Sequence, residues 1–287
     1  MDFENLQAFI MVARQGSFSS AAERLHLTQP AVSKRIATLE QQLDVRLFDR
    51  LGRQTMLTEA GHTLLPRARR ILAEIEDSRR ALNNLNGDVA GTLTLATSHH
   101  IGLHRLPPLL RAFTQRYPEV RLDLHFTDSE LACEAVGRGE LELAIVTLPQ
   151  SAPSALRCRV VWSDPLAVVA APDHALVQSG LLIPTQLQDW PAVLPGESTY
   201  TRRLIEQFFD RYDLTLEAAF ATNYLETIKM LVSVGLGWSV LPRSMLDEGL
   251  RELRIKGFDL CRELGVVRHA GHTLSNAARA LLELLPA

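Results

Sequence analysis

Aliphatic residues recur every three or four positions between residues 28 and 43, and this pattern fixes how the stretch can fold. The recurring residues are Val32, Ile36, Leu39 and Leu43. At about 100° per residue they fall within a narrow arc of one α-helix, so that face must pack against other parts of the protein. Thr28 is expected to cap this helix, and Pro30 fits its first turn because proline lacks an amide hydrogen that would be unpaired there.

Two shorter helical segments precede this stretch. The first is expected to end at Gly16 and has apolar residues at helical spacing, namely Leu6, Phe9, Ile10 and Ala13. The second is expected from Ala21 to Leu25, after serine hydroxyls that can cap its free amides. Three helices with a tight turn between the second and the third predict a helix-turn-helix.

The outer face of the third helix is small, polar and cationic. It carries Pro30, Ala31, Lys34, Ala37, Thr38 and Gln41, flanked by Gln29, Ser33 and Arg35. A helix enters the major groove of DNA only if its outer face is not bulky near the amino end, and Gln, Ser, Thr, Lys and Arg side chains bind base edges and phosphates. A face that is merely solvated is the alternative, but the turn before the helix and the basic segment after it favour DNA.

The segment from Asp44 to Thr58 predicts a two-stranded wing. Apolar and basic residues alternate around Gly52, namely Val45, Leu47 and Leu57 with Arg46, Arg50 and Arg53. Arginines on such a hairpin can reach phosphates or the minor groove. Asp44 is expected to end the third helix, a position that is often left-handed and that suits glycine better than aspartate.

A long helix is predicted after Thr58, because apolar residues there keep a period of about 3.5 residues over three heptads. The positions are Leu64, Ala68, Ile71, Ile75, Ser78, Leu82 and Leu85. One helix cannot bury such a seam alone. The seam therefore predicts a dimer, with packing against the chain's own domain as the alternative.

From Gly91 onward, strand and helix patterns alternate, which predicts two α/β units. The first has strands at 92–96, 120–126 and 141–146 and helices near 103–116 and 130–138. The second has strands near 165–171, 192–194, 216–221 and 238–241 and helices at 201–212 and 225–234, before 264–268 and a helix near 274–285 return to the first unit. The βαβαβ order predicts a parallel sheet. Two crossings between the units make a hinged cleft, the usual place for a small ligand.

The composition is that of an ordinary globular protein. The 287 residues are 46% hydrophobic and 22% charged, and the net charge of −3 excludes a strongly basic polymer-coating protein but not a local basic module. Three cysteines without a C-x-x-C spacing argue against a disulfide scaffold or a zinc ribbon. No secretory signal and no apolar run of about 18 residues are evident, so we expect a cytoplasmic protein without membrane contact.

Five linked motifs occupy the first 61 residues. They are Ala21-Ala22-x-x-Leu25, Thr28-Gln-Pro-Ala-Val-Ser33, Ile36-x-x-Leu-Glu40, Leu47-Phe-x-Arg50 and Leu57-Thr58-x-x-Gly61. In order and spacing they resemble the amino-terminal signature of LysR-type transcriptional regulators. Residues 138–145, 171–174 and 231–242 look like the effector-binding domain of the same family, so the resemblance covers nearly the whole chain.

The resemblance implies an α/β protein with an amino-terminal winged helix-turn-helix, a long linker helix and a two-subdomain effector domain similar to periplasmic binding proteins. The implied ranges are 1–57 for DNA binding, 58–88 for dimerisation and 91–287 for the effector, with subdomain I at about 91–162 and 266–287 and subdomain II at about 163–265. Such regulators form dimers and usually tetramers, bind double-stranded promoter DNA, and alter its bending when a small-molecule effector arrives. No cofactor and no catalytic activity are expected.

Carried over by position, the family's DNA contacts fall on the third helix and the wing. They are Gln29, Pro30, Ser33, Lys34 and Thr38, with Thr28 and Arg35 beside them and Arg50 and Arg53 in the wing. Two residues depart from the family pattern. Asp44 replaces a glycine that is usual at the end of the third helix, and Arg35 stands where glutamine is common, so we expect Arg35 to alter DNA affinity or site preference.

The same carry-over places the effector site where strands end and helices begin. Its residues are Ser98, His99, His100, Ser129 and Thr147 on one side of the cleft and Thr199, Thr201 and Thr222 on the other. Hydroxyls beside helix amino termini leave free amides and a positive dipole end facing the ligand, which favours a small carboxylate or other anion. The family more often has small hydroxyl residues at the two histidine positions, where imidazoles can pair with an anion or make binding pH-sensitive.

His100 and His104 lie one helical turn apart, but no nearby cysteine or spaced histidine completes a ligand set, so no metal site is predicted. The sequence as a whole predicts a DNA-binding transcriptional regulator that responds to a small effector and is not an enzyme. A small-molecule binding protein or an enzyme built on the cleft domain is the alternative.

Overall fold

The computed structural model describes residues 2–51 and 54–286, with the side chains of residues 50, 51 and 54 outside the description. The chain forms two units. The first unit contains Met1–Asn86 and Arg138–Glu140, and the second contains Gly87–Gly137 and Leu141–Ala287. Among the described residues, no helix is long and apolar enough to cross a membrane.

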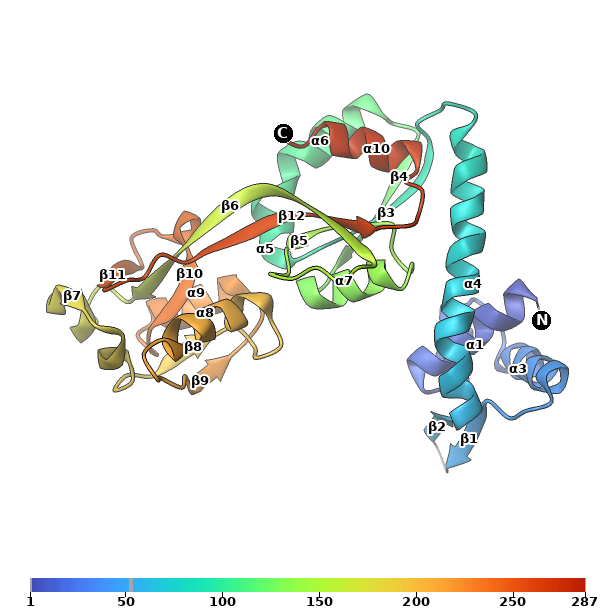
Figure 1. The fold of residues 1–287 in the computed structure, drawn as a ribbon, viewed down its shortest axis with the longest axis horizontal. Helices are drawn as coiled ribbons and strands as arrows, with labels where there is room; N and C mark the ends of the chain where they lie inside the picture. The colour runs from blue at the N-terminus through green and yellow to red at the C-terminus, as the bar shows by residue number, and fades with distance from the viewer. Residues whose placement is uncertain (1, 52–53, 287) are drawn as a thin grey trace. The chain divides into compact units, whose positions relative to one another are not determined.

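Three capped helices open the first unit (Figure 1). They are α1 (Phe3–Gln15), α2 (Phe18–Arg24) and α3 (Gln29–Leu43). The side chains of Asp2, Ser17 and Thr28 each accept a hydrogen bond from a backbone amide three residues later, so each helix starts at a side-chain cap. The second helix begins at Phe18, three residues before the predicted start, because Ser17 rather than a later serine caps it.

The aliphatic residues of α3 that the sequence pattern predicts to be buried do lie in the core of these helices. Val32 and Leu39 are fully buried and Ile36 almost so. They pack in one cluster with Phe9 of α1 and Ala21 of α2. Because this apolar edge is covered, the opposite edge of α3 is left to the solvent.

A hairpin and a long helix complete the first unit. Strands β1 (Phe48–Leu51) and β2 (Gln54–Leu57) pair antiparallel, and α4 (Glu59–Asn84) follows. The Glu40 carboxylate accepts hydrogen bonds from the amides of Leu47 (2.7 Å) and Phe48 (3.3 Å), which ties α3 to the hairpin. Thr58 caps α4 and donates its hydroxyl to the carbonyl oxygen of Arg46 at 2.7 Å.

The apolar seam of α4 is covered only at its beginning. Leu64, Leu65 and Leu72 pack against the core of the first unit. Farther along, the side chains of Leu82 and Leu85 are 65% and 81% exposed. The alternative of packing against the chain's own domain is therefore confirmed at the amino-terminal end of α4, while the exposed leucines at the carboxyl-terminal end leave the dimer a prediction.

The second unit is built on one mixed sheet with the strand order β4-β3-β5-β12-β6-β11-β7, and β10 pairs with β6. The strands are β3 (Gly91–Thr97), β4 (Val120–Phe126), β5 (Leu143–Thr147), β6 (Leu156–Ala170), β7 (Leu181–Leu182), β10 (Ser239–Pro242), β11 (Arg251–Ile255) and β12 (Cys261–His269). Strands β3, β4 and β5 are parallel, as predicted, but β12 lies antiparallel to both β5 and β6. The prediction of a parallel sheet for the first three strands is therefore confirmed, and the sheet as a whole is mixed because the long strands β6 and β12, which connect the two halves of the unit, run antiparallel to each other (Figure 1).

Helices cover both faces of the β3–β5 half, which we call lobe 1. Helices α6 (Leu106–Arg116) and α10 (Asn276–Glu283) pack on one face, and α7 (Ser129–Gly137) packs on the other (Figure 1). The single helix predicted near 103–116 is in fact two helices, α5 (His99–His104) and α6. The break falls at Arg105 because Pro107 and Pro108 have no amide hydrogens to continue α5.

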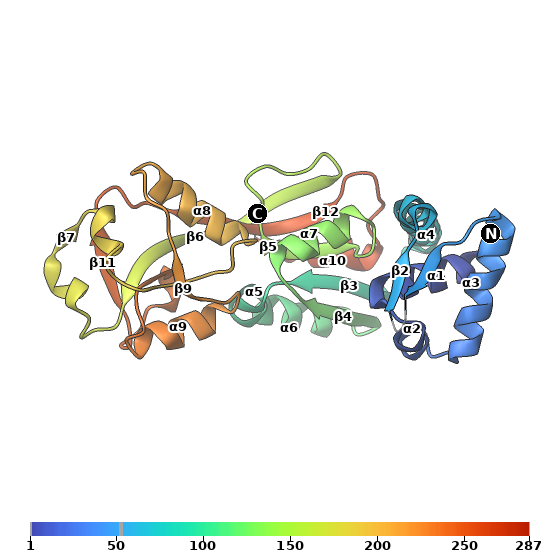
Figure 2. The same ribbon diagram turned by 90° about the horizontal axis from the view of Figure 1, so that it is seen from below.

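The other half, lobe 2, has its own core around the buried side chains of Trp238, Phe208 and Phe209. Its remaining elements are β8 (Ala192–Leu194), β9 (Ala218–Ala221), α8 (Tyr200–Asp210), α9 (Leu225–Ser233) and the short 3-10 helices η1 (Ala175–Ser179), η2 (Pro184–Leu187) and η3 (Arg243–Met245). Figure 2 shows α8 and α9 on opposite sides of this lobe. The indole N–H of Trp238 donates to the carbonyl oxygens of Leu187 and Trp190, which anchors the loop before β8.

Asp44 adopts the left-handed conformation (φ 52°) that its position predicts. Substituting it as Asp44→Gly should raise the free energy of unfolding of the first unit by about 0.5–1 kcal/mol, because glycine adopts this conformation without strain and the change removes a negative charge from a helix carboxyl end. Native-state hydrogen exchange of α3 amides measures this change. Asp44→Ala is the control and should lower the same free energy; a lower value for Asp44→Gly would contradict the prediction.

Candidate functional site

The outer edge of α3 presents the residue types that the sequence predicts. Thr28, Gln29, Pro30 and Lys34 are exposed, and Ser33, Arg35 and Thr38 are half-buried. The side chain of Gln29 donates to the Ser33 hydroxyl at 3.0 Å, and the Thr38 hydroxyl donates to the carbonyl oxygen of Lys34 at 2.9 Å. These hydrogen bonds between neighbouring residues hold the side chains close to the helix, so the outer face of α3 is not bulky.

Arg35 differs from its neighbours because it already has a charged partner. Its guanidinium pairs with the carboxylate of Glu4 in α1. A DNA phosphate would have to compete with this carboxylate, so the guanidinium of Arg35 is less available to DNA than the ammonium group of Lys34. In the wing, Arg53 lies outside the described residues, and of Arg50 only the backbone is described, paired with Thr55.

A small cavity lies between the two lobes of the second unit. Its volume is about 50 Å³, and it is lined by Ser98, His99, His100, Asp128, Ser129, Glu130, Thr147, Pro195, Thr199, Thr201, Asn223, Tyr224, Leu225 and Arg262. Seven of the eight predicted effector residues belong to this lining. Thr222 does not; its hydroxyl accepts a hydrogen bond from the amide of Tyr224, and Asn223 lines the cavity instead.

Hydroxyl groups in this cavity cap helices and strand ends. Thr199 caps α8, where its hydroxyl accepts from the Arg202 amide at 3.1 Å and donates to the Gly196 carbonyl oxygen at 2.8 Å. Ser129 begins α7 and accepts from the Thr147 amide at 3.1 Å. The predicted residues thus meet where α7 and α8 begin, which places two positive helix ends at one site.

A carboxylate from lobe 1 occupies the start of α8. The amide of Tyr200 donates a hydrogen bond to Oε1 of Glu130. Burial raises the pKa of Glu130 above its ordinary value, and the bond from Tyr200 opposes that rise. Sequence reasoning missed Glu130 because only the fold brings it to a helix that begins 70 residues later.

Arg262 is a buried cation at the same site. Its side chain is 6% exposed, its Nε donates to Oδ2 of Asp164 at 2.7 Å, and its Nη1 donates to the Thr201 hydroxyl at 3.2 Å. Its Nη2 is buried and has no hydrogen-bond partner among the described residues. An unpaired buried donor is costly, so this atom points to a missing acceptor.

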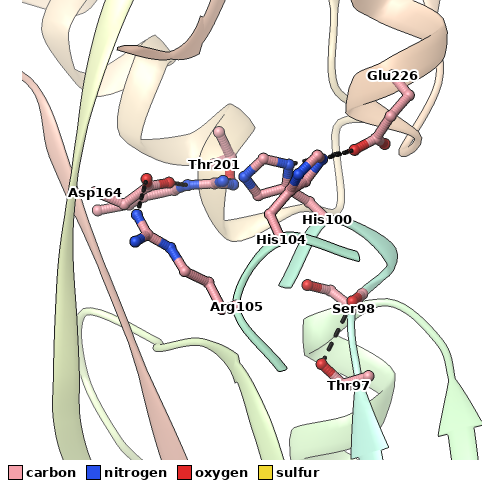
Figure 3. A network of polar contacts seen from close by, with 9 residues as sticks. Thr97, Ser98, His100, His104, Arg105, Asp164, Thr201 and Glu226 are labelled. Carbon is pink, nitrogen blue, oxygen red and sulfur yellow. Dashed lines mark hydrogen bonds and ion pairs between the residues drawn. The ribbon is translucent and has the colours of Figure 1, made fainter. Parts of the chain in front are cut away.

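Two histidines and a carboxylate meet at the rim of the cleft (Figure 3). His100 Nδ1 lies 3.3 Å and His104 Nε2 lies 3.0 Å from Oε1 of Glu226, which belongs to α9 in lobe 2. Burial, together with the nearby charge of Arg262, lowers the pKa of His100 to about 4, although Glu226 acts in the opposite direction. His100 is therefore a neutral imidazole at neutral pH.

Direct contacts close the cleft. The Asn223 amide donates to Oδ2 of Asp128 at 2.7 Å, and the ring of His99 lies 4.7 Å from that of Tyr224. A volume of about 50 Å³ holds a water molecule or two, whereas typical ligand pockets have volumes of roughly 300–1,000 Å³. Entry of a ligand therefore requires some of these contacts to separate.

Two family models match the chain. The model described as bacterial regulatory helix-turn-helix protein, lysR family, matches residues 3–62. The model described as LysR substrate binding domain matches residues 86–287. Together they span both units.

Two relatives of this chain agree with the family matches. The RuBisCO operon transcriptional regulator of Allochromatium vinosum is 30% identical over 290 residues, 99% of this chain and 95% of that protein. An Azotobacter vinelandii protein, named an uncharacterized HTH-type transcriptional regulator in the ibpB-leuC intergenic region, is 79% identical over 108 residues, 38% of this chain and 75% of that protein.

Two full-length structures share the fold. An OxyR variant from Pseudomonas aeruginosa has a TM-score of 0.71 at 23% identity and covers 99% of this chain and 94% of that chain. CbnR complexed with its target DNA has a TM-score of 0.64 at 22% identity and covers 99% of both chains.

Because burial lowers the pKa of His100 from 6.5 to about 4, the second unit should lose stability as the pH falls through that window. Unfolded His100 takes up a proton near pH 6.5, so the unfolded state binds more protons and the free energy of unfolding falls by up to about 1.4 kcal/mol per pH unit. Urea unfolding followed by tryptophan fluorescence measures the effect, since all three tryptophans lie in the second unit.

His100→Gln should flatten this pH dependence and His125→Gln, an exposed control, should not. Equal slopes for His100→Gln and the wild type would contradict the prediction.

Proposed function

Because this chain belongs to the LysR family of bacterial transcriptional regulators, we propose that its helix α3 reads promoter DNA and that its cleft binds a small anionic effector. The chain is an effector-responsive DNA-binding regulator and not an enzyme. The alternative of an enzyme built on the cleft domain does not fit a chain whose full-length relative is a transcriptional regulator.

We propose one function for each region of the chain. Residues 1–57 bind DNA, residues 58–88 dimerise, and residues 91–287 bind the effector, with subdomain I at 91–162 and 266–287 and subdomain II at 163–265. Separate hydrophobic clusters in the two lobes, around Leu93 and around Trp238, support this division because each lobe can keep its shape while the cleft changes. We place the protein in the cytoplasm, where promoter DNA is found.

DNA contact is proposed for the outer edge of α3 and for the wing. The contact residues are Thr28, Gln29, Pro30, Ser33, Lys34, Arg35, Thr38, Arg50 and Arg53. The observation that supports the helix is the burial of Val32, Ile36 and Leu39 on its aliphatic edge, which leaves the polar edge free for the major groove. Arg35 is proposed to contribute less than Lys34, because its guanidinium is paired with the Glu4 carboxylate.

The observation that carries the effector proposal is the pair of anion-binding groups at the start of α8. The Tyr200 amide already binds a carboxylate, that of Glu130, and the buried Nη2 of Arg262 has no acceptor. Helix amino termini and arginine forks both select carboxylates and other oxyanions. An effector carboxylate would replace Glu130 on the Tyr200 amide and give Arg262 its missing acceptor.

The remaining predicted effector residues fit around that carboxylate. Thr199 and Thr201 offer hydroxyls beside Arg262, while Ser98, His99, His100, Ser129 and Thr147 face them from lobe 1. We keep Thr222 as an indirect contributor, because its hydroxyl binds the amide of Tyr224 in the lining.

Self-association is part of the family's mode of action, and we propose a dimer through α4 and a tetramer of two dimers. The exposed Leu82 and Leu85 support the dimer, since each seam can cover the other. A tetramer would bring two pairs of α3 helices to two DNA sites.

The substitution Ser33→Arg tests the groove-facing edge. A long cation there should crowd the groove and weaken binding to a selected promoter fragment by about 100-fold, or ~2.7 kcal/mol, with no loss of folding. Fluorescence anisotropy measures the affinity for the promoter fragment. It is repeated at two salt concentrations, because the wild-type affinity should fall steeply as salt rises. Ser151→Arg adds the same charge to an exposed loop of the second unit and should bind as the wild type does. Unchanged specific binding by Ser33→Arg would contradict the α3 proposal.

A thermal-shift panel of small carboxylates, sulfur oxyanions and amino acids tests the cleft on the full chain. At least one anion should raise the unfolding midpoint, because a ligand of the folded state stabilises it. Glu130→Gln should bind that anion about tenfold more tightly, since it removes a competing negative charge. Thr199→Leu should abolish the shift.

Ser275→Leu is the matched control, because Ser275 caps α10 as Thr199 caps α8 but lies outside the cavity lining. A panel in which only neutral or cationic compounds bind would contradict the anionic effector.

A further inference from the structure

The rim of the cleft brings together three metal-ligating side chains. His100 and His104 are one turn apart on α5, and Glu226 comes from α9 on the opposite lobe. One ligand atom from each lies within 4.8 Å of the other two. Figure 3 shows both imidazoles pointing toward the carboxylate. The sequence shows the histidine pair but not the third ligand, because Glu226 is 122 positions from His104.

The spacing from Glu226 to each histidine matches what one ion requires. Ligand atoms bound to a tetrahedral Zn²⁺ at about 2.0–2.1 Å are roughly 3.3 Å from each other. Oε1 of Glu226 is 3.3 Å from His100 Nδ1 and 3.0 Å from His104 Nε2. Small side-chain rotations therefore suffice to place an ion among the three.

His100 is also prepared as a ligand. Its side chain is 4% exposed, and Nε2 is buried without a hydrogen-bond partner among the described residues, so Glu226 is its polar contact. The nearby Arg262 guanidinium pairs with Asp164, which offsets its positive charge. The side chain of His104 is 49% exposed, which provides an entry path for an ion from solvent.

We propose that His100, His104 and Glu226 bind a divalent transition-metal ion, with Zn²⁺ as the best fit to two imidazoles and one carboxylate. Three protein ligands leave a fourth position for water or for an oxygen of another ligand. Because the histidines belong to lobe 1 and Glu226 to lobe 2, the ion joins the two lobes and favours the closed cleft. This inference does not depend on the anionic effector, whose carboxylate is proposed to bind the Tyr200 amide and Arg262.

Metal titration of the full-length, tag-free chain tests the site. Two exposed cysteines can also bind metals, so the experiment uses a Cys158→Ser/Cys261→Ser background. After treatment with a chelator, Zn²⁺ is titrated in competition with a chromophoric chelator, and Co²⁺ is followed by its visible absorption. We expect one equivalent to bind and to raise the unfolding midpoint.

The variants His104→Ala and Glu226→Gln should each weaken Zn²⁺ binding by at least about tenfold. The matched control is His125→Ala, because His125 is equally exposed and contacts one carboxylate, Asp123, at 3.2 Å. Its Zn²⁺ affinity should equal that of the background protein. No stoichiometric uptake, or equal affinities for His104→Ala, Glu226→Gln and His125→Ala, would overturn the proposal.

Discussion

The second unit depends on the antiparallel pairing of β6 and β12, the two long strands that pass through both lobes. Their register places Arg262 directly opposite Asp164, and the two side chains form a buried ion pair. Removing one partner of such a pair typically costs about 3–5 kcal/mol, because the other charge is left buried alone. Three residues farther along β12, the strands approach so closely that a Cβ on Gly265 would lie 2.1 Å from the carbonyl oxygen of Arg159. Strand pairing therefore fixes both the connection between the lobes and the position of a cation at the cleft.

The Nη2 atom of Arg262 lacks a hydrogen-bond acceptor among the described residues. The rest of the cleft is held closed by polar contacts between the two lobes. Glu130 binds the start of α8, Asn223 binds Asp128, and Glu226 binds two histidines. Each of these contacts is polar and can be exchanged for a contact with a ligand. A ligand that replaces some of them changes the relative stability of closed and open forms, and this differential affinity is what an effector needs in order to shift a population.

Local features of the sequence predicted the DNA-binding unit well. The periodicity of Val32, Ile36 and Leu39, the cap at Thr28 and the left-handed Asp44 are all decided within a few residues, so their spacing carries the information. The cleft was predicted only in outline. Its hydroxyl residues follow strands and precede helices, which is a local signal, whereas Arg262, Glu130 and Glu226 reach the cleft through pairings between distant segments. The antiparallel direction of β12 was not predicted for the same reason, because strand direction depends on which distant strand becomes a neighbour.

In the proposed mechanism, an external carboxylate takes the place of Glu130 between Tyr200 and Arg262. A crystal structure of the full chain with a bound carboxylate would show this exchange. We predict one carboxylate oxygen within hydrogen-bond distance of the Tyr200 amide and another near Nη2 of Arg262, with Glu130 displaced. A structure in which Glu130 still binds the Tyr200 amide while the ligand lies elsewhere would contradict the claim.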